Sequence, residues 1–323
     1  MQKYFNYLIN KLTNKYKIQS VLIAISGGQD SICLIRLFES FNKVHNLKKI
    51  EYIYVDHQWS KNSKKQILHI INYLRFLKKN IHIYQISKID SSEYISRKCR
   101  YHIIVNHAAL NKHQAVITAH TKTDKLETFL LNLARGTGLE GATSLNLHQK
   151  LNYSLNLFRP LIFTNRINIA FFCKKWFLPL WSDISNYNYN IRRNRIRNEI
   201  FPYLKKYLNN KYENHFLKFL KTCYYDNEYI KQKTTKLYIY LKSDHYIAIN
   251  FHLLKQEPFS IQVRILQLLI YHNLCVILNT KILIKVIKYI NINMIKKYSV
   301  SINSLQYLRL YLNIKWIYIT LKI

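Results

Sequence analysis

A glycine-containing turn is the first group of residues in this chain that could do chemistry. Ser26-Gly27-Gly28-Gln29-Asp30-Ser31 follows the apolar run at residues 21–25 and precedes helically spaced apolar residues at 32–41. Such a turn presents backbone N–H groups and hydroxyls to an anion at the start of a helix. It has neither the G-x-x-x-x-G-K-[ST] pattern of a Walker A loop nor the G-x-G-x-x-G pattern of a dinucleotide site. We therefore predict a phosphate-binding loop of another type.

Asp30 places a carboxylate among these phosphate-binding groups. A carboxylate repels phosphate unless a cation lies between them, and Mg²⁺ is the cation that prefers such oxygen ligands. The sequence therefore predicts that Asp30 holds Mg²⁺. The alternative is an acid that only interacts favourably with the dipole of the helix that begins here.

A second polar group follows a later apolar run, at residues 115–119. His120, Asp124 and Glu127 occur in order after it. Residues 124 and 127 are three apart, so on a helix they share one face and can act on the same ligand. The alternatives are acids that favour the first turn of a helix and a histidine with ordinary hydrogen bonds at a strand end.

The charge of the chain predicts a polyanionic partner. There are 50 Lys and Arg against 16 Asp and Glu, a formal net charge of +34. Such a field attracts nucleic acid. The run Arg192-Arg193-Asn194-Arg195-Ile196-Arg197 is its densest part, and bidentate phosphate contacts are predicted for Arg193, Arg195 and Arg197. A solvated basic face is the alternative. Lys, Asn, Ile, Tyr and Phe abound while Gly (5) and Pro (4) are scarce, so drift towards A/T-rich codons explains part of the charge.

Strand-like and helix-like segments alternate through the first half of the chain. This alternation predicts a doubly wound, mostly parallel α/β sheet. Ligands bind beyond the carboxyl ends of the strands in that architecture, which is where the polar groups occur. The predicted strands are residues 21–25, 50–55, 81–86 and 115–119, and the predicted helices are 32–41, 64–79, 93–110 and 125–135.

The pattern changes beyond about residue 203. Helical segments rich in Lys and Tyr appear there, with short β-branched runs at 246–250 and 316–320. We predict a catalytic domain at residues 1–209 and a smaller, largely helical RNA-binding domain at 210–323.

Several classes of protein are disfavoured by what the sequence lacks. The number of cysteines is five and there is no C-x-x-C, which argues against a disulfide framework or a zinc knuckle and fits a reducing compartment. The apolar stretch at 265–280 is shorter than the roughly 20 residues that span a bilayer, and it contains polar residues. The first residues have no apolar signal-peptide core.

Ser26-Gly27-Gly28-Gln29-Asp30-Ser31 resembles the S-G-G-x-D-S loop of the N-type ATP pyrophosphatases. Further segments resemble, in order, the motifs of the tRNA(Ile)-lysidine synthetases within that superfamily. These segments are Val55-Asp56-His57, Ser96-Arg97-Lys98-Cys99-Arg100-Tyr101, the run from Ala119 to Thr128, the run from Leu133 to Gly141, Arg159-Pro160-Leu161, Asp183-Ile184-Ser185-Asn186 and Arg193-Asn194-Arg195-Ile196-Arg197. They cover residues from about 21 to 202.

The resemblance implies a two-step reaction. ATP adenylates the C2 oxygen of the wobble cytidine in a CAU-anticodon tRNA(Ile), and free L-lysine then displaces AMP through its ε-amine. The codon read changes from AUG to AUA. The implied cofactors are ATP, bound by residues 26–31, and Mg²⁺.

The resemblance also implies roles for individual residues. Asp30, Arg100, His120, Asp124 and Glu127 are implied catalytic residues. Within this set the two acids of the helix face bind lysine, while the arginine and the histidine lie nearer the ATP.

The sequence departs from the family pattern at four positions, which puts peripheral contacts in doubt. Thr121, Thr123 and Lys125 replace histidine, aspartate and glutamine, and Ser60 stands near a usual arginine.

Two other functions remain open from the sequence. A related tRNA thiolase is one, although many of those enzymes need paired cysteines, which this chain lacks. A non-catalytic, basic RNA-binding protein with a retained fold is the other. The composition favours a plastid stroma with organelle-encoded synthesis, and a bacterial cytoplasm is the alternative. A homodimer is left open.

Overall fold

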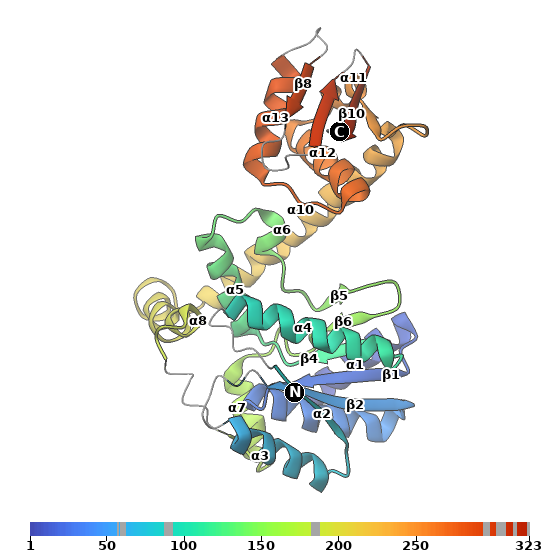
Figure 1. Ribbon diagram of the computed structural model, residues 1–323. Coiled ribbons are helices and arrows are strands. Elements are labelled where there is room, and N and C mark those ends of the chain that lie inside the picture. The colour runs from blue at the N-terminus through green and yellow to red at the C-terminus, as the bar shows by residue number, and fades with distance from the viewer. Residues whose placement is uncertain are drawn as a thin grey trace. The chain divides into compact units, whose positions relative to one another are not determined.

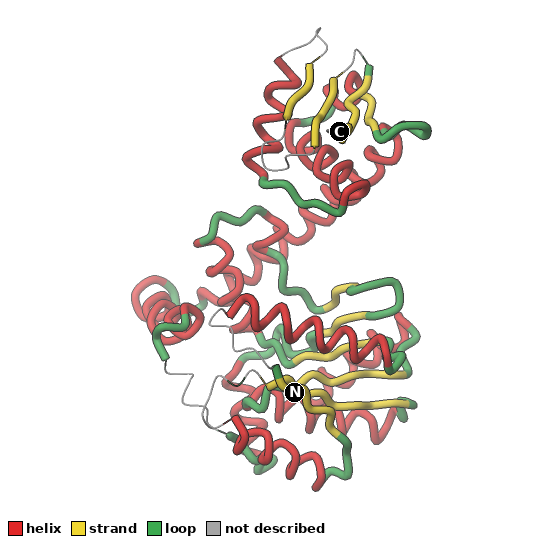
Figure 2. The backbone as a smooth tube through the Cα atoms, in the orientation of Figure 1, coloured by secondary structure: helices red, strands yellow, loops and turns green. Residues whose placement is uncertain are grey.

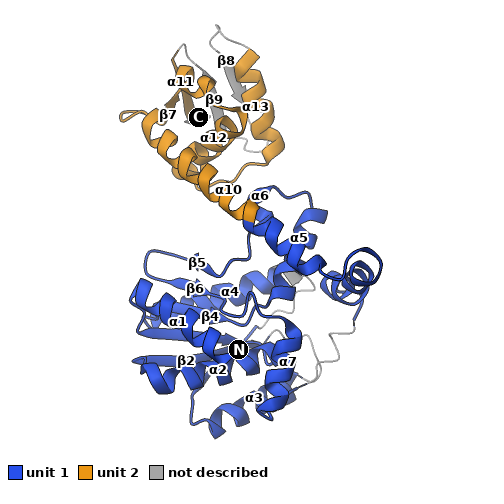
Figure 3. Ribbon diagram, turned by 180° about the vertical axis from the view of Figure 1, so that it is seen from behind, with its two compact units in different colours: residues 1–221 blue, residues 222–323 orange. Residues whose placement is uncertain are grey.

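The computed structural model describes residues 1–56, 58, 63–86, 93–181, 188–292, 298–301, 308–312 and 315–321. His57, Ser60 and the motif residues 183–186 named in the sequence analysis lie outside these ranges. The chain divides into two compact units, residues 1–221 and 222–323 (Figure 3).

The first unit is built on a six-stranded sheet in the order β3-β2-β1-β4-β6-β5 (Figure 1). Neighbouring strands from β3 to β6 run parallel, and only β5 pairs antiparallel, with β6. The order reverses direction at β1, from which the chain moves first to β2 and β3 and later to β4. This is the doubly wound arrangement that the sequence predicted. The strands are β1 (Ser20–Ile25), β2 (Lys49–Asp56), β3 (Ile81–Gln85), β4 (Ala115–Thr118), β5 (His148–Lys150) and β6 (Asn156–Phe158).

Helices cover both faces of this sheet (Figures 1 and 2). Alternate residues of one strand point to opposite faces, so Val21 and Ile23 of β1 join one core and Leu22 joins the other. The first core includes side chains of α1 (Gln2–Tyr16), α2 (Gln29–His45), α3 (Ser63–Phe76) and α7 (Arg166–Lys175). The second includes Ile104 and Ala108 of α4 (Glu93–Leu110).

Short helices complete the first unit after the sheet. They pack beside α5 (Lys122–Ala134) in a separate small core that contains Leu126, Ile196 and Phe201. The remaining elements are α6 (Leu139–Ala142), α8 (Arg192–Arg195), the π-helical η2 (Ile196–Ile200), α9 (Phe201–Tyr203), the π-helical η3 (Leu204–Leu208) and the start of α10 (Tyr212–Leu241).

The second unit contains the rest of α10 and its own core. Its four-stranded antiparallel sheet has the order β7-β10-β9-β8. Its core includes Ile265 and Leu269 of α12 and Ile287 of α13. The elements are β7 (Ala248–Asn250), α11 (Phe251–Gln256), α12 (Phe259–Leu274), α13 (Thr280–Ile292), β8 (Tyr298–Ser301), β9 (Leu308–Leu312) and β10 (Trp316–Leu321).

The four strands and four helices predicted for the first half are confirmed, with ends shifted by a few residues. The predicted domain boundary after residue 209 falls just before α10, whereas the two compact units divide inside that helix. No helix within the described ranges is both long and apolar enough to cross a membrane.

Candidate active site at the carboxyl edge of the sheet

The turn between β1 and α2 forms a compact loop with internal hydrogen bonds. The Ser26 N–H donates to Ser31 Oγ over 3.0 Å, and the two serine hydroxyl oxygens lie 2.9 Å apart. Gly27 has φ +77°, in the left-handed region that favours glycine. Gly28 is the N-cap of α2 and has no side chain, so the first N–H groups of the 17-residue helix lack a side-chain cap. This is the geometry of an anion site at a helix N-terminus.

Asp30 lies in the first turn of α2 and faces a cation from another element. Arg166, the first residue of α7, donates from Nη2 to Asp30 Oδ2 over 3.3 Å. Burial raises the pKa of Asp30 to about 6; Arg166 opposes this shift and Asp124 adds to it. A carboxylate that is this costly to ionise gains strongly from a bound cation.

Asp124 lies in the first turn of α5 and uses its two oxygens differently. Oδ2 accepts hydrogen bonds from the N–H and the Oγ of Thr121, over 2.8 and 2.9 Å. This oxygen therefore caps the helix, as the alternative interpretation of the sequence required. Oδ1 lies 4.0 Å from Arg166 and 3.8 Å from Arg197, and so faces the same region as Asp30. Asp124 thus caps α5 with one oxygen and turns the other towards Arg166 and Arg197.

Glu127 is completely buried and paired with two arginines. Its Oε2 accepts from Arg193 Nε over 2.8 Å and from Arg197 Nη2 over 3.1 Å, while its Oε1 accepts from Arg197 Nε over 2.7 Å. Arg193 also donates to Thr128 Oγ1. A carboxylate this deeply paired fixes the geometry of the site, and a ligand cation would have to share it with two guanidinium groups.

The arginines of the basic run separate into two faces. Arg193 and Arg197 are four residues apart and turn inward to Glu127, with 19% of each side chain exposed. Arg195 is exposed and donates from Nε to the carbonyl of Tyr189 over 2.9 Å. A role in tRNA binding stays a prediction for all three.

His120 follows β4, and its surroundings favour the neutral imidazole. Its Nδ1 lies 2.9 Å from Thr118 Oγ1. Burial lowers its pKa well below the usual range; Asp124 opposes this, while Arg159, Arg97 and Arg193 add to it. A neutral histidine can donate or accept a hydrogen bond without adding to the positive charge here.

Two arginines, Arg97 and Arg100, lie on α4. Arg97, one turn before Arg100, contributes to the field at His120 and stacks over the ring of Tyr101 at 5.6 Å. Burial raises the pKa of the Tyr101 hydroxyl, but Arg159, Arg97 and Arg100 outweigh this effect and lower it. The helix therefore brings Arg97 within the field of His120, whereas Arg100 is placed only by its effect on Tyr101.

Two arginines were not predicted as site residues. Arg166 and Arg159 each have a buried Nε without a hydrogen-bond partner among the described residues. Unpaired buried donors are costly unless a ligand accepts from them. The R-P-L motif marked Arg159 in the sequence, but only the packing of α7 brings Arg166 to Asp30.

The site also fits Mg²⁺. Asp30 and Asp124 contribute carboxylate oxygens on the same side, both within 4.0 Å of Arg166. Oxygen ligands from one or two carboxylates, with phosphate oxygens completing the set, are what Mg²⁺ prefers.

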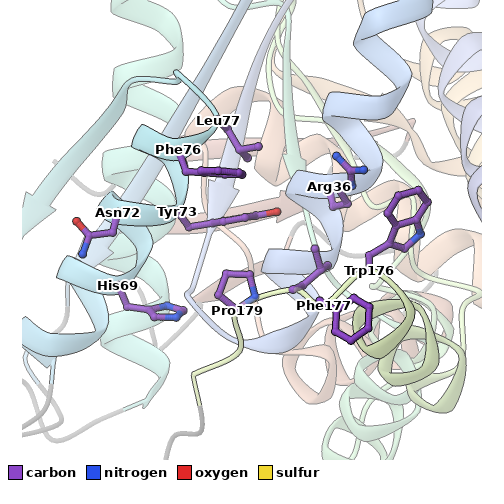
Figure 4. Close-up of a pocket in the computed structure, with 10 residues that line it drawn as sticks. Arg36, His69, Asn72, Tyr73, Phe76, Leu77, Trp176, Phe177 and Pro179 are labelled. Carbon is purple, nitrogen blue, oxygen red and sulfur yellow. The ribbon is translucent and has the colours of Figure 1, made fainter.

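An apolar pocket of about 470 Å³ lies elsewhere on this unit (Figure 4). Tyr73 and Phe76 of α3 line it with Trp176 and Phe177, which follow α7, and none of the predicted site residues does so. The guanidinium of Arg36 lies 4.5 Å from the Trp176 ring. The pocket is therefore separate from the charged site.

This loop, on this doubly wound sheet, defines a PP-loop domain. The profile of a family described as "PP-loop domain" matches residues 1–204. A solved structure described as a U34-tRNA thiolase from Methanococcus maripaludis shares the fold, with a TM-score of 0.53, 14% identity and coverage of 66% of this chain and 79% of that one.

Similar proteins of known name show which family within the PP-loop class this chain resembles. The tRNA(Ile)-lysidine synthase, chloroplastic, of Gracilaria tenuistipitata is 46% identical, covering 88% of this chain and 89% of its own length. The chloroplastic protein of the same name from Pyropia yezoensis is 33% identical, covering 94% of this chain and 90% of its own length. The tRNA(Ile)-lysidine synthase of Synechocystis is 30% identical, covering 76% of each chain. The chain therefore belongs to the tRNA(Ile)-lysidine synthase family.

Proposed function

We propose that this chain ligates free L-lysine to C2 of the wobble cytidine of a CAU-anticodon tRNA(Ile), using ATP. The observation that carries the proposal is an anion-binding loop that faces acids on α5, in a chain similar to lysidine synthases over most of its length. The product tRNA would read AUA in place of AUG.

In the first step the cytidine C2 oxygen attacks the α-phosphorus of ATP and pyrophosphate leaves. The loop at residues 26–31 and the N-terminus of α2 bind the phosphates. The unpaired Nε atoms of Arg159 and Arg166 supply further donors for the charge that develops. Mg²⁺, held by Asp30, supplies charge neutralisation when bound.

In the second step the ε-amine of lysine attacks C2, the bond from C2 to the adenylate oxygen breaks, and AMP leaves. Asp124 Oδ1 is the acid best placed to orient the lysine amines, because Glu127 is already paired with two arginines. Glu127 is also a proposed lysine ligand, and it would bind lysine while it stays paired with Arg193 and Arg197.

The incoming amine must lose a proton, since its unperturbed pKa is about 10.4. Near the adenylate we place His120, kept neutral, and Arg100. The neutral imidazole of His120 can orient and hydrogen-bond without adding positive charge that would repel the lysine. The guanidinium of Arg100 is always charged, and we place it at the phosphate of the adenylate.

We further propose that tRNA contacts come from Arg193, Arg195, Arg197 and residues from about 210 onward, and that the protein acts in a plastid. Relatives named as chloroplastic support the plastid, and a relative from Synechocystis supports the alternative of a bacterial cytoplasm. A homodimer stays open within the proposal.

The test uses the full chain with ATP, labelled lysine and transcripts of the two CAU tRNAs, for isoleucine and for methionine. We expect label in the isoleucine transcript alone, with pyrophosphate released only when tRNA is present. Asp30→Asn serves as the inactive control. Label in neither transcript, with tRNA-dependent pyrophosphate release intact, would mean that another nucleophile is used.

A further inference from the structure

Three histidines surround one carboxylate at the end of the sheet opposite to the site described above. Glu51 is the third residue of β2 and His82 is the second residue of β3, so both lie near the amino ends of these parallel strands. His107 belongs to the last turn of α4, and His113 follows that helix. The register pairs Ile53 with His82, which places Glu51 and His82 on the same face of the sheet.

Two distances in this cluster, from His82 and from His107 to Glu51, match the spacing of metal ligands better than that of hydrogen bonds. His82 Nε2 and His107 Nε2 each lie 3.4 Å from Glu51 Oε2. These are long for N–H···O bonds, which usually span about 2.7–3.2 Å. Ligands about 2.0–2.1 Å from a tetrahedral ion are about 3.4 Å apart. The three ligand atoms all lie within 4.8 Å of one another.

Further partners orient these ligands. Tyr84 Oη lies 2.8 Å from Nδ1 of His107, so a proton on Nδ1 leaves the lone pair on Nε2, towards Glu51. His113 Nε2 lies 2.9 Å from Glu51 Oε2, and its Nδ1 lies 2.9 Å from Ser20 Oγ. Metal-binding histidines and carboxylates have partners of this kind, which fix the tautomer and the ring.

One nearby cation must be accommodated. Lys49 Nζ lies 3.0 Å from Glu51 Oε1, the other carboxylate oxygen, and 40% of its side chain is exposed. It can therefore swing towards water when a cation occupies the cluster. The C-terminal end of α4 carries partial negative charge, which favours a cation near His107.

We propose that Glu51 Oε2, His82 Nε2 and His107 Nε2 bind one divalent ion of the zinc type, with the fourth position left to water. Two imidazoles select zinc over Mg²⁺ or Ca²⁺, which prefer oxygen ligands. The ion would join the edge strand β3 and the helix α4 to β2, at the end of the sheet away from the ATP loop.

The test is metal binding by the full-length protein after treatment with a chelator. Co²⁺ is titrated first, because tetrahedral cobalt absorbs visible light, and Zn²⁺ is then used to displace it. We expect one equivalent to bind. His82→Ala, at a position where 41% of the side chain is exposed, should weaken binding at least about 100-fold. Tyr84→Phe, which removes only an orienting hydroxyl, should weaken it about 10-fold or more.

The matched control is His102→Ala. His102 lies on α4 as well, but it is exposed and contacts Asn106. It should leave affinity and stoichiometry unchanged. Equal metal affinity in wild type, His82→Ala and Tyr84→Phe would overturn the proposal. A loss of metal affinity in His102→Ala as large as that in His82→Ala would also overturn it. Thermal denaturation of the metal-free proteins verifies that each variant is folded.

Discussion

Arg197 Nε lies 2.7 Å from Oε1 of Glu127, whose side chain is completely buried. Glu127→Gln would remove the counter-charge that Arg193 and Arg197 share, and would leave Arg197 only the more distant Asp124, at 3.8 Å. Loss of one partner from a buried ion pair typically costs about 3–5 kcal/mol. We expect the free energy of unfolding in urea to fall by about 3 kcal/mol. Glu199→Gln, an exposed acid on the neighbouring η2, is the control, and a loss below 1 kcal/mol at Glu127 would contradict this role.

Asp124→Asn separates lysine binding from helix capping. The amide oxygen can still accept from Thr121, so the free energy of unfolding should change by less than about 1 kcal/mol. A charge-assisted hydrogen bond to lysine contributes about 1.5–3 kcal/mol, so the KM for lysine should rise about 10- to 100-fold while tRNA affinity stays unchanged. Thr121→Val removes only the hydroxyl of the cap and should leave that KM near wild type. A normal lysine dependence in Asp124→Asn would place the lysine site elsewhere.

Asp30→Asn should stop ATP cleavage and also stabilise the ligand-free protein. The pKa of Asp30 is raised to about 6 from an ordinary 3.8, so the folded state binds more protons than the unfolded state between these values. Its contribution to stability is therefore lost as pH rises from about 4 to about 6. Asparagine has no charge to bury, and the variant should gain up to about 3 kcal/mol over wild type above pH 7.

Thermal denaturation of both proteins from pH 4 to pH 8 measures this gain. Asp226→Asn, at an exposed position of α10, is the control and should give no such gain. Near-normal turnover in Asp30→Asn would show that Asp30 is not part of the site. A gain in stability that does not depend on pH would show that the gain does not come from the ionisation of Asp30.

The exposed and inward arginines of the basic run should behave differently. Arg195→Ala should weaken tRNA binding and reduce the slope of log affinity against log salt by about 0.7–0.9, with little change in Tm. Arg193→Ala should lower Tm, because it removes a partner of Glu127. Binding titrations at several salt concentrations test the first variant. If the slope of log affinity against log salt is unchanged in Arg195→Ala, then Arg195 does not contact a phosphate, and its charge reflects only the drift of codon composition.

The end of the first unit can be tested by truncation. A chain ending at Lys221 keeps Tyr212 and Leu220, which are buried in the small core beside α5; a chain ending at Lys211 loses both. Burial of each such side chain contributes about 1.5–3 kcal/mol. We expect the longer fragment to have the higher Tm, to bind ATP, and to lose most tRNA affinity. Full tRNA affinity in that fragment would contradict an RNA-binding role for the remainder.

Much of the first unit could be predicted because its signals are local. β1 and β4 are short apolar runs that end at polar residues, and the helix at 93–110 has the bounds found for α4. The hairpin of β5 and β6 was missed, because strands of three residues carry too little periodicity to identify.

In the candidate site, the residue types could be predicted from the sequence, but the contacts between elements could not. Asp30 and Asp124 could be proposed from their places after strands, but their shared contact with Arg166 depends on how α7 packs. The inward turn of Arg193 and Arg197 likewise depends on the fold. The sequence of a basic run does not indicate whether its arginines pair with a buried glutamate or with a phosphate.

The left-handed backbone of Gly27 limits how this chain can evolve. A Cβ at this position would lie 2.7 Å from Cδ1 of the fully buried Ile70 and 2.9 Å from Nε2 of Gln66, on top of the strain of φ +77°. Only five glycines occur in 323 residues, and this is one of them. Any amino-acid change here would therefore carry a structural cost, so we expect the loop to tolerate substitution poorly.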